Sequence, residues 1–143
     1  MLHVQRIVLD TNVLVSSLLN KQSLPYLLCP AWDEGKYTLV TSPEQLEELE
    51  RVLCYPKLKK YINDSQAAIM VTGLWNHADI VSELPDVEYS NDPTDNRIIA
   101  TAIAGKSTYL VTGDKRDLLH LVIVEGVKIV TVRQMLAIFG VAE

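Results

Sequence analysis

Short apolar runs alternate along the chain with longer segments in which apolar residues recur every three or four positions. The short runs, which are typical of buried β-strands, cover residues 4–9, 37–40, 80–81, 109–112 and 127–130. The helical spacing predicts a helix that begins at residue 11 and further helices over residues 23–35, 43–54, 64–77, 94–104 and 131–139. A short helix or turn is expected over residues 57–62 and a single helical turn over residues 117–121. Strands that alternate with helices indicate an α/β fold with a mainly parallel sheet covered on both faces.

Two of these helices carry more detailed expectations. The helix over residues 43–54 has the clearest start in the chain, because Ser42 can cap it, Pro43 suits its first position and Gln45 can complete a capping box. The residues expected on the inward face of the helix over 64–77 are Ala68, Val71, Leu74 and Trp75.

The chain has 143 residues without an internal repeat, a low-complexity tract or a Gly/Ser-rich linker, so we expect a single domain over residues 1–143. Cys29 and Cys54 lie in helical segments rather than in a paired framework, which favours reduced thiols. The N-terminus lacks a signal-peptide pattern, and no apolar run approaches the ~20 residues of a membrane span. A soluble, cytoplasmic protein is therefore expected.

The formal net charge is −5, whereas a general attraction to phosphate backbones requires a basic surface. If the partner is a nucleic acid, its binding must be local. Two basic groups could assist such binding or could equally be solvated surface: Lys57, Lys59 and Lys60, and Arg97, Lys115 and Arg116.

Two aspartates directly follow predicted strands, at the edge where ligands bind in an open α/β sheet. Asp10 follows the first strand, and Asp114 follows Gly113, whose conformational freedom permits a sharp turn after the strand over 109–112. Each also has a simpler interpretation. Asp10 could cap the next helix, and Asp114 could belong to turn chemistry together with Asp117.

A third aspartate is placed more tellingly. Asp95 shares a helix face with Ile99 and Ala102, at spacings i, i+4 and i+7, and that face is the apolar one. Asp92, ahead of Pro93, is the better candidate for the helix cap, which leaves Asp95 free for chemistry. Carboxylates that gather at one place repel each other, so this set would need a cation.

A fourth acid could come from the helix over 43–54, whose inward stripe is Leu46, Leu49 and Leu53 with Val52. Glu48 and Glu50 flank this stripe on opposite sides, and periodicity does not separate them. A solvated flank is the alternative for either one.

Four segments, in this order, resemble those of PIN-domain ribonucleases. They are Ile-Val-Leu-Asp-Thr-Asn-Val from residue 7, Ser-Pro-Glu-Gln-Leu-Glu-Glu-Leu from residue 42, Asp-Pro-Thr-Asp-Asn-Arg-Ile-Ile-Ala-Thr-Ala from residue 92 and Tyr-Leu-Val-Thr-Gly-Asp from residue 109. The chain looks most similar to the VapC-like branch, the toxin components of toxin–antitoxin systems. The resemblance covers residues 6 to about 136. It implies a three-layer α/β/α fold whose acidic cluster binds Mg²⁺ or Mn²⁺ and hydrolyses RNA.

Carried over by position, the resemblance implies that the catalytic and metal-binding residues are Asp10, Glu48, Asp95 and Asp114. Only the resemblance selects Glu48 over Glu50. Asn12 and Thr112 match polar positions near the metal, and with the basic Arg97 they are the candidate substrate-binding residues. Asp117 is a weaker candidate ligand, because it lies three residues after Asp114 where many relatives have an aspartate two residues later. A small antitoxin partner and a homodimer or higher homo-oligomer are also implied.

The resulting hypothesis is metal-assisted hydrolysis, in which a divalent ion activates water for in-line attack and stabilises the leaving 3′ oxygen. Hard carboxylate oxygens suit Mg²⁺ and Mn²⁺. The histidines, His3, His77 and His120, lie outside the motifs and are not needed for this chemistry.

Two other functions are compatible with parts of this pattern. A Mg-dependent phosphatase of the haloacid-dehalogenase type also uses an aspartate after a strand, but it needs an acid where this chain has Asn12, and its Gly-Asp-x-x-x-Asp motif is one residue longer than residues 113–117. The second is a non-catalytic RNA- or protein-binding module of the same fold, and the presence of all four acids argues against it.

Overall fold

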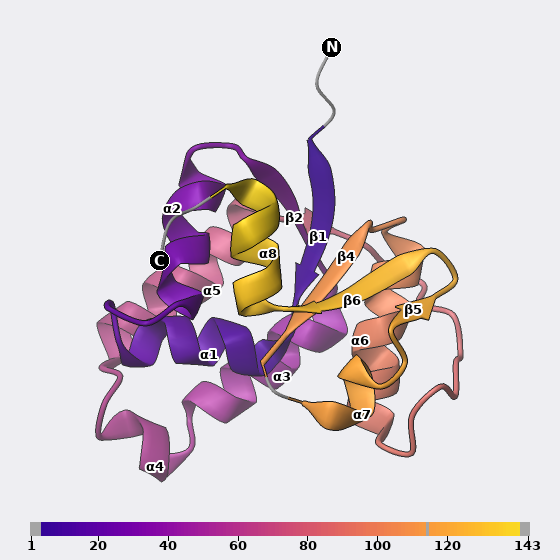
Figure 1. Cartoon of the computed structure of the whole chain (residues 1–143). Coiled ribbons are helices and arrows are strands. Elements are labelled where there is room, and N and C mark those ends of the chain that lie inside the picture. The colour runs from indigo at the N-terminus through magenta and orange to yellow at the C-terminus, as the bar shows by residue number, and fades with distance from the viewer. Residues whose placement is uncertain (1–3, 114, 141–143) are drawn as a thin grey trace.

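The computed structural model of the protein describes residues 4–113 and 115–140. In this part of the chain a six-stranded sheet lies between two layers of helices (Figure 1). The strands are β1 (Gln5–Leu9), β2 (Tyr37–Thr41), β3 (Asp79–Ile80), β4 (Tyr109–Thr112), β5 (Ile123–Val124) and β6 (Val127–Thr131). Their order in the sheet is β3-β2-β1-β4-β6-β5, and every neighbouring pair is parallel except β5 and β6.

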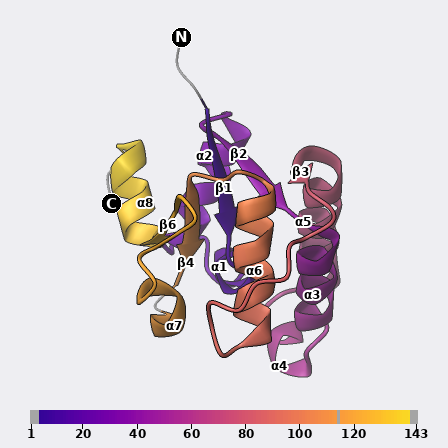
Figure 2. The ribbon, with the colours of Figure 1, turned by 90° about the vertical axis from the view of Figure 1, so that its right-hand side faces the viewer.

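Most helices cover one face of this sheet. They are α1 (Thr11–Leu19), the 3₁₀ turn η1 (Pro25–Leu27), α2 (Leu28–Asp33), α3 (Pro43–Leu53), α5 (Asp64–His77) and α8 (Val132–Phe139). The short α4 (Pro56–Lys59) continues from the end of α3. The opposite face carries α6 (Pro93–Ala104) and α7 (Arg116–Leu119). Figure 2 shows α6 in front of the sheet from that side. The three-layer α/β/α fold is therefore confirmed.

Each face of the sheet has its own hydrophobic core, because successive side chains of a strand point to opposite faces. In β1, Ile7 and Leu9 pack into the core under α1, α3 and α8. Val8 packs on the other side with Ile98 and Ile99 of α6. The apolar runs of the central strands are buried on both faces, as expected for a parallel sheet.

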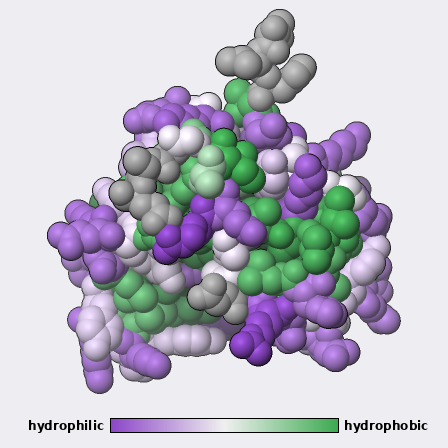
Figure 3. All heavy atoms as spheres, viewed as in Figure 1, coloured by the Kyte–Doolittle hydropathy of each residue, from purple (hydrophilic) through white to green (hydrophobic). Residues whose placement is uncertain are grey.

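Most predicted elements agree with the structure. The helix predicted over residues 23–35 is instead the 3₁₀ turn η1 followed by α2, and the other differences lie near the end of the chain and on one helix face. The antiparallel strand β5 was not predicted. It follows Val122, whose φ of 63° turns the chain out of the continuous apolar run 121–124. That edge is also apolar on the outside: Figure 3 shows hydrophobic side chains gathered over β5 and β6.

The inward face predicted for α5 is partly wrong. Leu74 is buried and Val71 packs against the core, but Ala68 is exposed and Trp75 is 41% exposed. The helix instead packs through Ala67, Met70, Val71 and Leu74. Apolar residues lie on every side of α5, so their spacing alone does not define its buried face.

Both cysteines are free, as predicted, and Cys54 is exposed. The longest helix, α5, has 14 residues, and no helix in the described part of the chain is long and apolar enough to cross a membrane.

Candidate active site

A pocket of about 240 Å³ lies where β1 ends and α1 begins. The residues that line it are Asp10, Thr11, Asn12, Val15, Ser16, Glu48, Val52, Thr94 and Lys115. Four separate segments thus contribute: the β1–α1 turn, α3, the first turn of α6 and the residues between β4 and α7. This position, beyond the carboxyl ends of parallel strands, is the usual ligand site of an open α/β sheet.

Asp10 is held at the floor of this region by the strand that precedes it. Its backbone amide donates to the Val111 carbonyl at 2.8 Å, which extends the pairing of β1 with β4 by one residue. Its side chain is only 4% exposed and makes no capping hydrogen bond to α1. Instead, Oδ2 accepts a hydrogen bond from the Thr112 hydroxyl at 2.9 Å. Asp10 is thus the N-cap residue of α1 by position, as one interpretation predicted, but its side chain makes no capping hydrogen bond.

This burial also shifts the pKa of Asp10. Burial raises the pKa of the Asp10 carboxyl above its ordinary value, and the nearby Asp95 charge adds to the increase. The Thr112 hydrogen bond and the Lys115 charge lower the pKa again, but only in part. Asp10 and Asp95 are thus close enough to repel each other.

Asp95 sits in the first turn of α6 and is 1% exposed, as its position on the apolar helix face predicted. Asp92 caps the same helix, since its Oδ1 accepts from the Thr94 amide at 2.9 Å, and this hydrogen bond lowers the pKa of Asp92. Asp95 therefore does not cap the helix. Its Oδ2 accepts from the Ser90 hydroxyl at 3.0 Å, and its Oδ1 accepts from the Lys115 ammonium.

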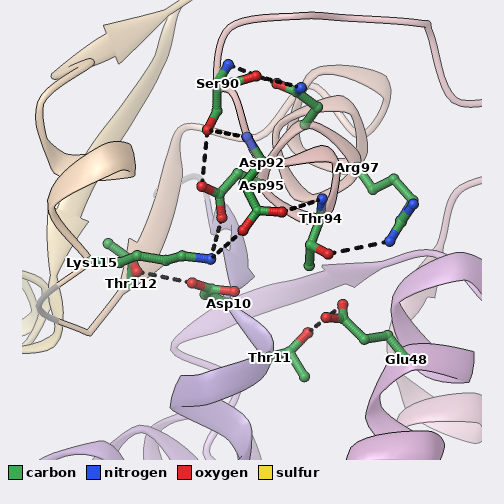
Figure 4. A network of polar contacts seen from close by, with 11 residues as sticks. Asp10, Thr11, Glu48, Ser90, Asp92, Thr94, Asp95, Arg97, Thr112 and Lys115 are labelled. Atoms are coloured by element: carbon green, nitrogen blue, oxygen red, sulfur yellow. Dashed lines mark hydrogen bonds and ion pairs between the residues drawn. The ribbon is translucent and has the colours of Figure 1, made fainter.

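Lys115 brings a positive charge to this group of acids (Figure 4). Its Nζ bonds to Asp95 and lies 3.6 Å from Asp92 Oδ2. Burial by itself would lower the pKa of Lys115, but the hydrogen bond to Asp95 and the charges of Asp95, Asp10 and Asp92 outweigh it and raise that pKa. Lys115 therefore carries its positive charge at neutral pH.

Glu48 approaches from the other wall of the pocket. It lies on the half-buried edge of α3, and its Oε2 accepts from the Thr11 hydroxyl at 3.2 Å (Figure 4). Glu50 lines a different hollow with Cys54 and Asp64. The structure thus separates the two glutamates that periodicity left equivalent, and it places Glu48 with Asp10.

The other residues that the sequence suggested are placed as follows. Asn12 lines the pocket, whereas Thr112 is buried beneath it and touches Asp10. Arg97 is exposed and donates to the Thr94 hydroxyl at 3.3 Å, and Asp117 lines a separate hollow beside α7. Asp114 lies outside the described residues.

The acidic side chains of the described residues can bind a divalent cation, but only a few of them could contact it directly. No three acidic, histidine or cysteine side chains within residues 4–113 and 115–140 lie close enough together to form a metal site. Mg²⁺, however, keeps several waters and typically binds through one or two carboxylates. Asp10 and Glu48 face one pocket, with Asp95 behind the Lys115 ammonium, so hard oxygen donors are available to such an ion.

Several supporting residues escaped the sequence analysis. Gln45 was identified only as part of a helix cap, yet its side chain is buried, donates to the Leu9 carbonyl at 2.6 Å and accepts from the Thr41 hydroxyl at 2.6 Å. Ser90 and Thr11 orient the acids from a loop and a helix start. Polar residues next to the motifs were the available signal, but their partners depend on tertiary contacts.

Comparison with known proteins gives one family. Residues 6–116 match the family described as PIN domain. The chain is also 32% identical over 117 residues to the uncharacterized protein MJ1680 of Methanocaldococcus jannaschii, an alignment that covers 81% of this chain and 74% of that protein. PIN domains are generally nucleases and usually use divalent metal ions. On its fold, its acidic pocket and these matches, the chain belongs to the PIN domain family.

Proposed function

We propose that the protein is a ribonuclease that hydrolyses phosphodiester bonds with Mg²⁺ or Mn²⁺ at the pocket formed by Asp10 and Glu48. The observation that supports this most directly is the approach of two carboxylates from distant segments to one pocket, with a buried third acid, Asp95, beside it. Packing of the hydrophobic core does not require a charged side chain at any of these three positions.

The side chains of the pocket would divide the work. Asp10, Glu48 and Asp95 would hold the metal, in part through the waters that Mg²⁺ keeps. The hydroxyls of Thr112 and Thr11 would fix the orientation of two of these carboxylates through the hydrogen bonds already formed. A bound divalent ion would supply the positive charge that acidifies a water and stabilises the charge developing on the phosphate.

The exposed residues at the pocket would meet the substrate. Asn12 and Thr94 line the pocket and can donate hydrogen bonds to phosphate oxygens. Arg97 adds a cation one turn along α6, where its guanidinium already bonds to Thr94. Because these contacts are to the backbone of the nucleic acid, they position the substrate without reading its sequence.

A second group of residues supports a single-stranded RNA substrate. Val52 lines the pocket, and its carbonyl accepts from the Tyr55 amide at 3.0 Å, so the segment 55–61 leads directly away from the site. Tyr55 and Tyr61 are 49% and 69% exposed, with three exposed lysines between them. Exposed aromatic rings among basic residues are suited to stacking unpaired bases.

The test is cleavage of a mixed single-stranded RNA pool with Mg²⁺ or Mn²⁺ and with EDTA. The wild-type protein should cut only with metal, and Asp10→Asn and Asp95→Asn should each lower the rate by at least about 10²-fold, the scale on which loss of one charge-stabilising group acts. Circular dichroism must show that both variants are folded. Full activity of either variant would remove that residue from the site, and metal-independent cleavage would contradict the proposal.

We further propose that the chain is the toxin of a toxin–antitoxin pair and that a small protein partner restrains it. The resemblance to VapC-type toxins supports this, as does a separate apolar pocket of about 680 Å³ between α1, α2 and α5 that could receive a partner helix. Induced production of the wild-type chain should arrest bacterial growth, whereas the Asp10→Asn variant at equal abundance should not. Normal growth with active enzyme would remove the toxin role and leave the nuclease.

A further inference from the structure

Lys115 is the one basic residue among the described residues that line the acidic pocket. Its ammonium lies between acids of two elements: it bonds to Asp95 and faces Asp92, and its charge also acts on Asp10. Figure 4 shows the side chain extending across the top of Asp10 toward α6. The position of this charge coincides with the place where a cation would neutralise the same carboxylates.

The burial of Asp95 makes that charge necessary to the protein without metal. The Asp95 side chain is 1% exposed, while that of Lys115 is 32% exposed. A carboxylate removed from water must be paired and hydrogen-bonded, or it must take up a proton. Ser90 donates one neutral hydrogen bond to Asp95, and Lys115 provides the charge.

We propose that Lys115 is a tethered counter-cation of the acidic pocket, which neutralises Asp95 in the metal-free protein and is displaced when a divalent ion binds. The inference rests on the proposed metal-dependent function, and it assigns to this side chain the regulation of metal entry. The Lys115 side chain is 32% exposed and has a flexible four-carbon stem, so it can turn toward solvent, whereas Asp95 is fixed in the first turn of α6.

Two consequences follow from the same charge balance. Without metal, removal of the ammonium leaves Asp95 buried with no opposite charge, so the metal-free protein should lose stability. With metal, the incoming ion no longer has to displace a cation that is already bonded to one of its ligands, so its affinity should rise. A lysine that only forms a structural ion pair with Asp95, away from the position of the metal, would show the first effect without the second.

The experiment compares Lys115→Met with Lys115→Arg, which keeps the charge, and with Arg116→Gln, which removes an exposed charge from the neighbouring position. Mn²⁺ binding is followed by electron paramagnetic resonance without RNA, and unfolding is followed by urea titration in EDTA. For Lys115→Met we expect a Kd for Mn²⁺ about tenfold lower than that of the wild type, the change that one nearby charge typically makes at a carboxylate. Lys115→Arg and Arg116→Gln should bind Mn²⁺ like the wild type.

In EDTA, Lys115→Met should unfold at a lower urea concentration, and adding Asp95→Asn should restore much of the loss, because the buried charge is then gone. If Lys115→Met does not fold without metal, refolding on addition of Mn²⁺ supports the inference, and failure to refold overturns it.

The outcomes separate this inference from the proposed function. Equal or weaker Mn²⁺ affinity of Lys115→Met, with the wild type binding Mn²⁺, overturns the counter-cation and leaves the metal-dependent nuclease in place. Absence of Mn²⁺ binding to both proteins overturns the metal dependence and the inference together.

Discussion

At the level of single residues, Asp10 shows most clearly that the pocket contains a buried charge that lowers the stability of the metal-free fold. Burial raises the pKa of its carboxyl, which means that the charged form is less favourable in the folded protein than in the unfolded chain. Asp10 therefore destabilises the metal-free fold at neutral pH. Its contribution improves as the pH falls through its folded-state pKa, where it takes up a proton.

Asp10→Asn should accordingly raise the melting temperature of the metal-free protein at pH 7, because the amide removes the buried charge and can still accept the Thr112 hydrogen bond. The gain over the wild type should shrink as the pH is lowered through the pKa of Asp10. Thermal unfolding in EDTA measures both effects, with Asp86→Asn as the control at an exposed acid. A lower melting temperature for Asp10→Asn at pH 7 would show that the carboxylate stabilises the fold.

The two glutamates of α3 allow a matched comparison. Glu48 faces Thr11 and the pocket, whereas Glu50 lies on the opposite flank of the helix. Glu48→Gln should lower the rate of RNA cleavage by about 10²-fold, and Glu50→Gln should leave it unchanged. The measurement is the steady-state rate of RNA cleavage by each variant with Mn²⁺. Equal rates for the two variants would exclude Glu48 from the site.

Residue placement was predictable where local periodicity determines it. The apolar face of α6 predicted the burial of Asp95, and the residue before Pro93 predicted the Asp92 cap. The partner of Asp95 was not predictable, because Lys115 is twenty residues away in sequence and reaches it only through the packing of α6 beside β4. Lys115 could be identified only as a basic residue near a motif.

At the level of elements, α3 ties the pocket to the sheet. The Gln45 side chain bridges the Leu9 carbonyl at the end of β1 and the Thr41 hydroxyl at the end of β2, and all three groups are buried. The first turn of α3 is thereby fixed beside the residue that precedes Asp10. Glu48 lies one turn later on the same helix, so the two hydrogen bonds of Gln45 also fix where Glu48 lies.

Gln45→Leu should lower the free energy of unfolding by about 1–3 kcal/mol, since it leaves a buried carbonyl and a buried hydroxyl without partners. Leucine has roughly the same size as glutamine, so the loss of stability would come from the two unpaired polar groups rather than from a cavity. Urea unfolding gives the value, with Glu44→Gln on the exposed face as the control. A change no larger than that of the control would mean that water replaces Gln45.

Helix starts were predicted most closely where a cap and a proline mark them. α3 begins at Pro43, as predicted, and α6 begins at Pro93, one residue before its predicted start. The signals fail at β5, where one residue in a left-handed conformation divides a single apolar run, and on α5, where apolar residues on all sides leave its orientation to tertiary packing. Both failures concern long-range contacts that propensity does not encode.

At the scale of the whole molecule, the parallel sheet accounts for the site. β1 and β4 are adjacent and parallel although a hundred residues separate them, so the segments that follow them emerge at one edge. The crossovers place α3 and the start of α6 at the same edge, where Glu48 and Thr94 line one pocket with Asp10. Four motifs that are each weak in sequence become one pocket because of this topology.

The central claim, that these distant carboxylates form one divalent-cation site, is tested most directly by a crystal structure of the wild-type protein with Mn²⁺. The anomalous difference map should contain its strongest peak in the pocket between Asp10 and Glu48, and Asp10→Asn crystals prepared in the same way should lack it. Peaks confined to other surfaces, or an empty pocket at saturating Mn²⁺, would contradict the account.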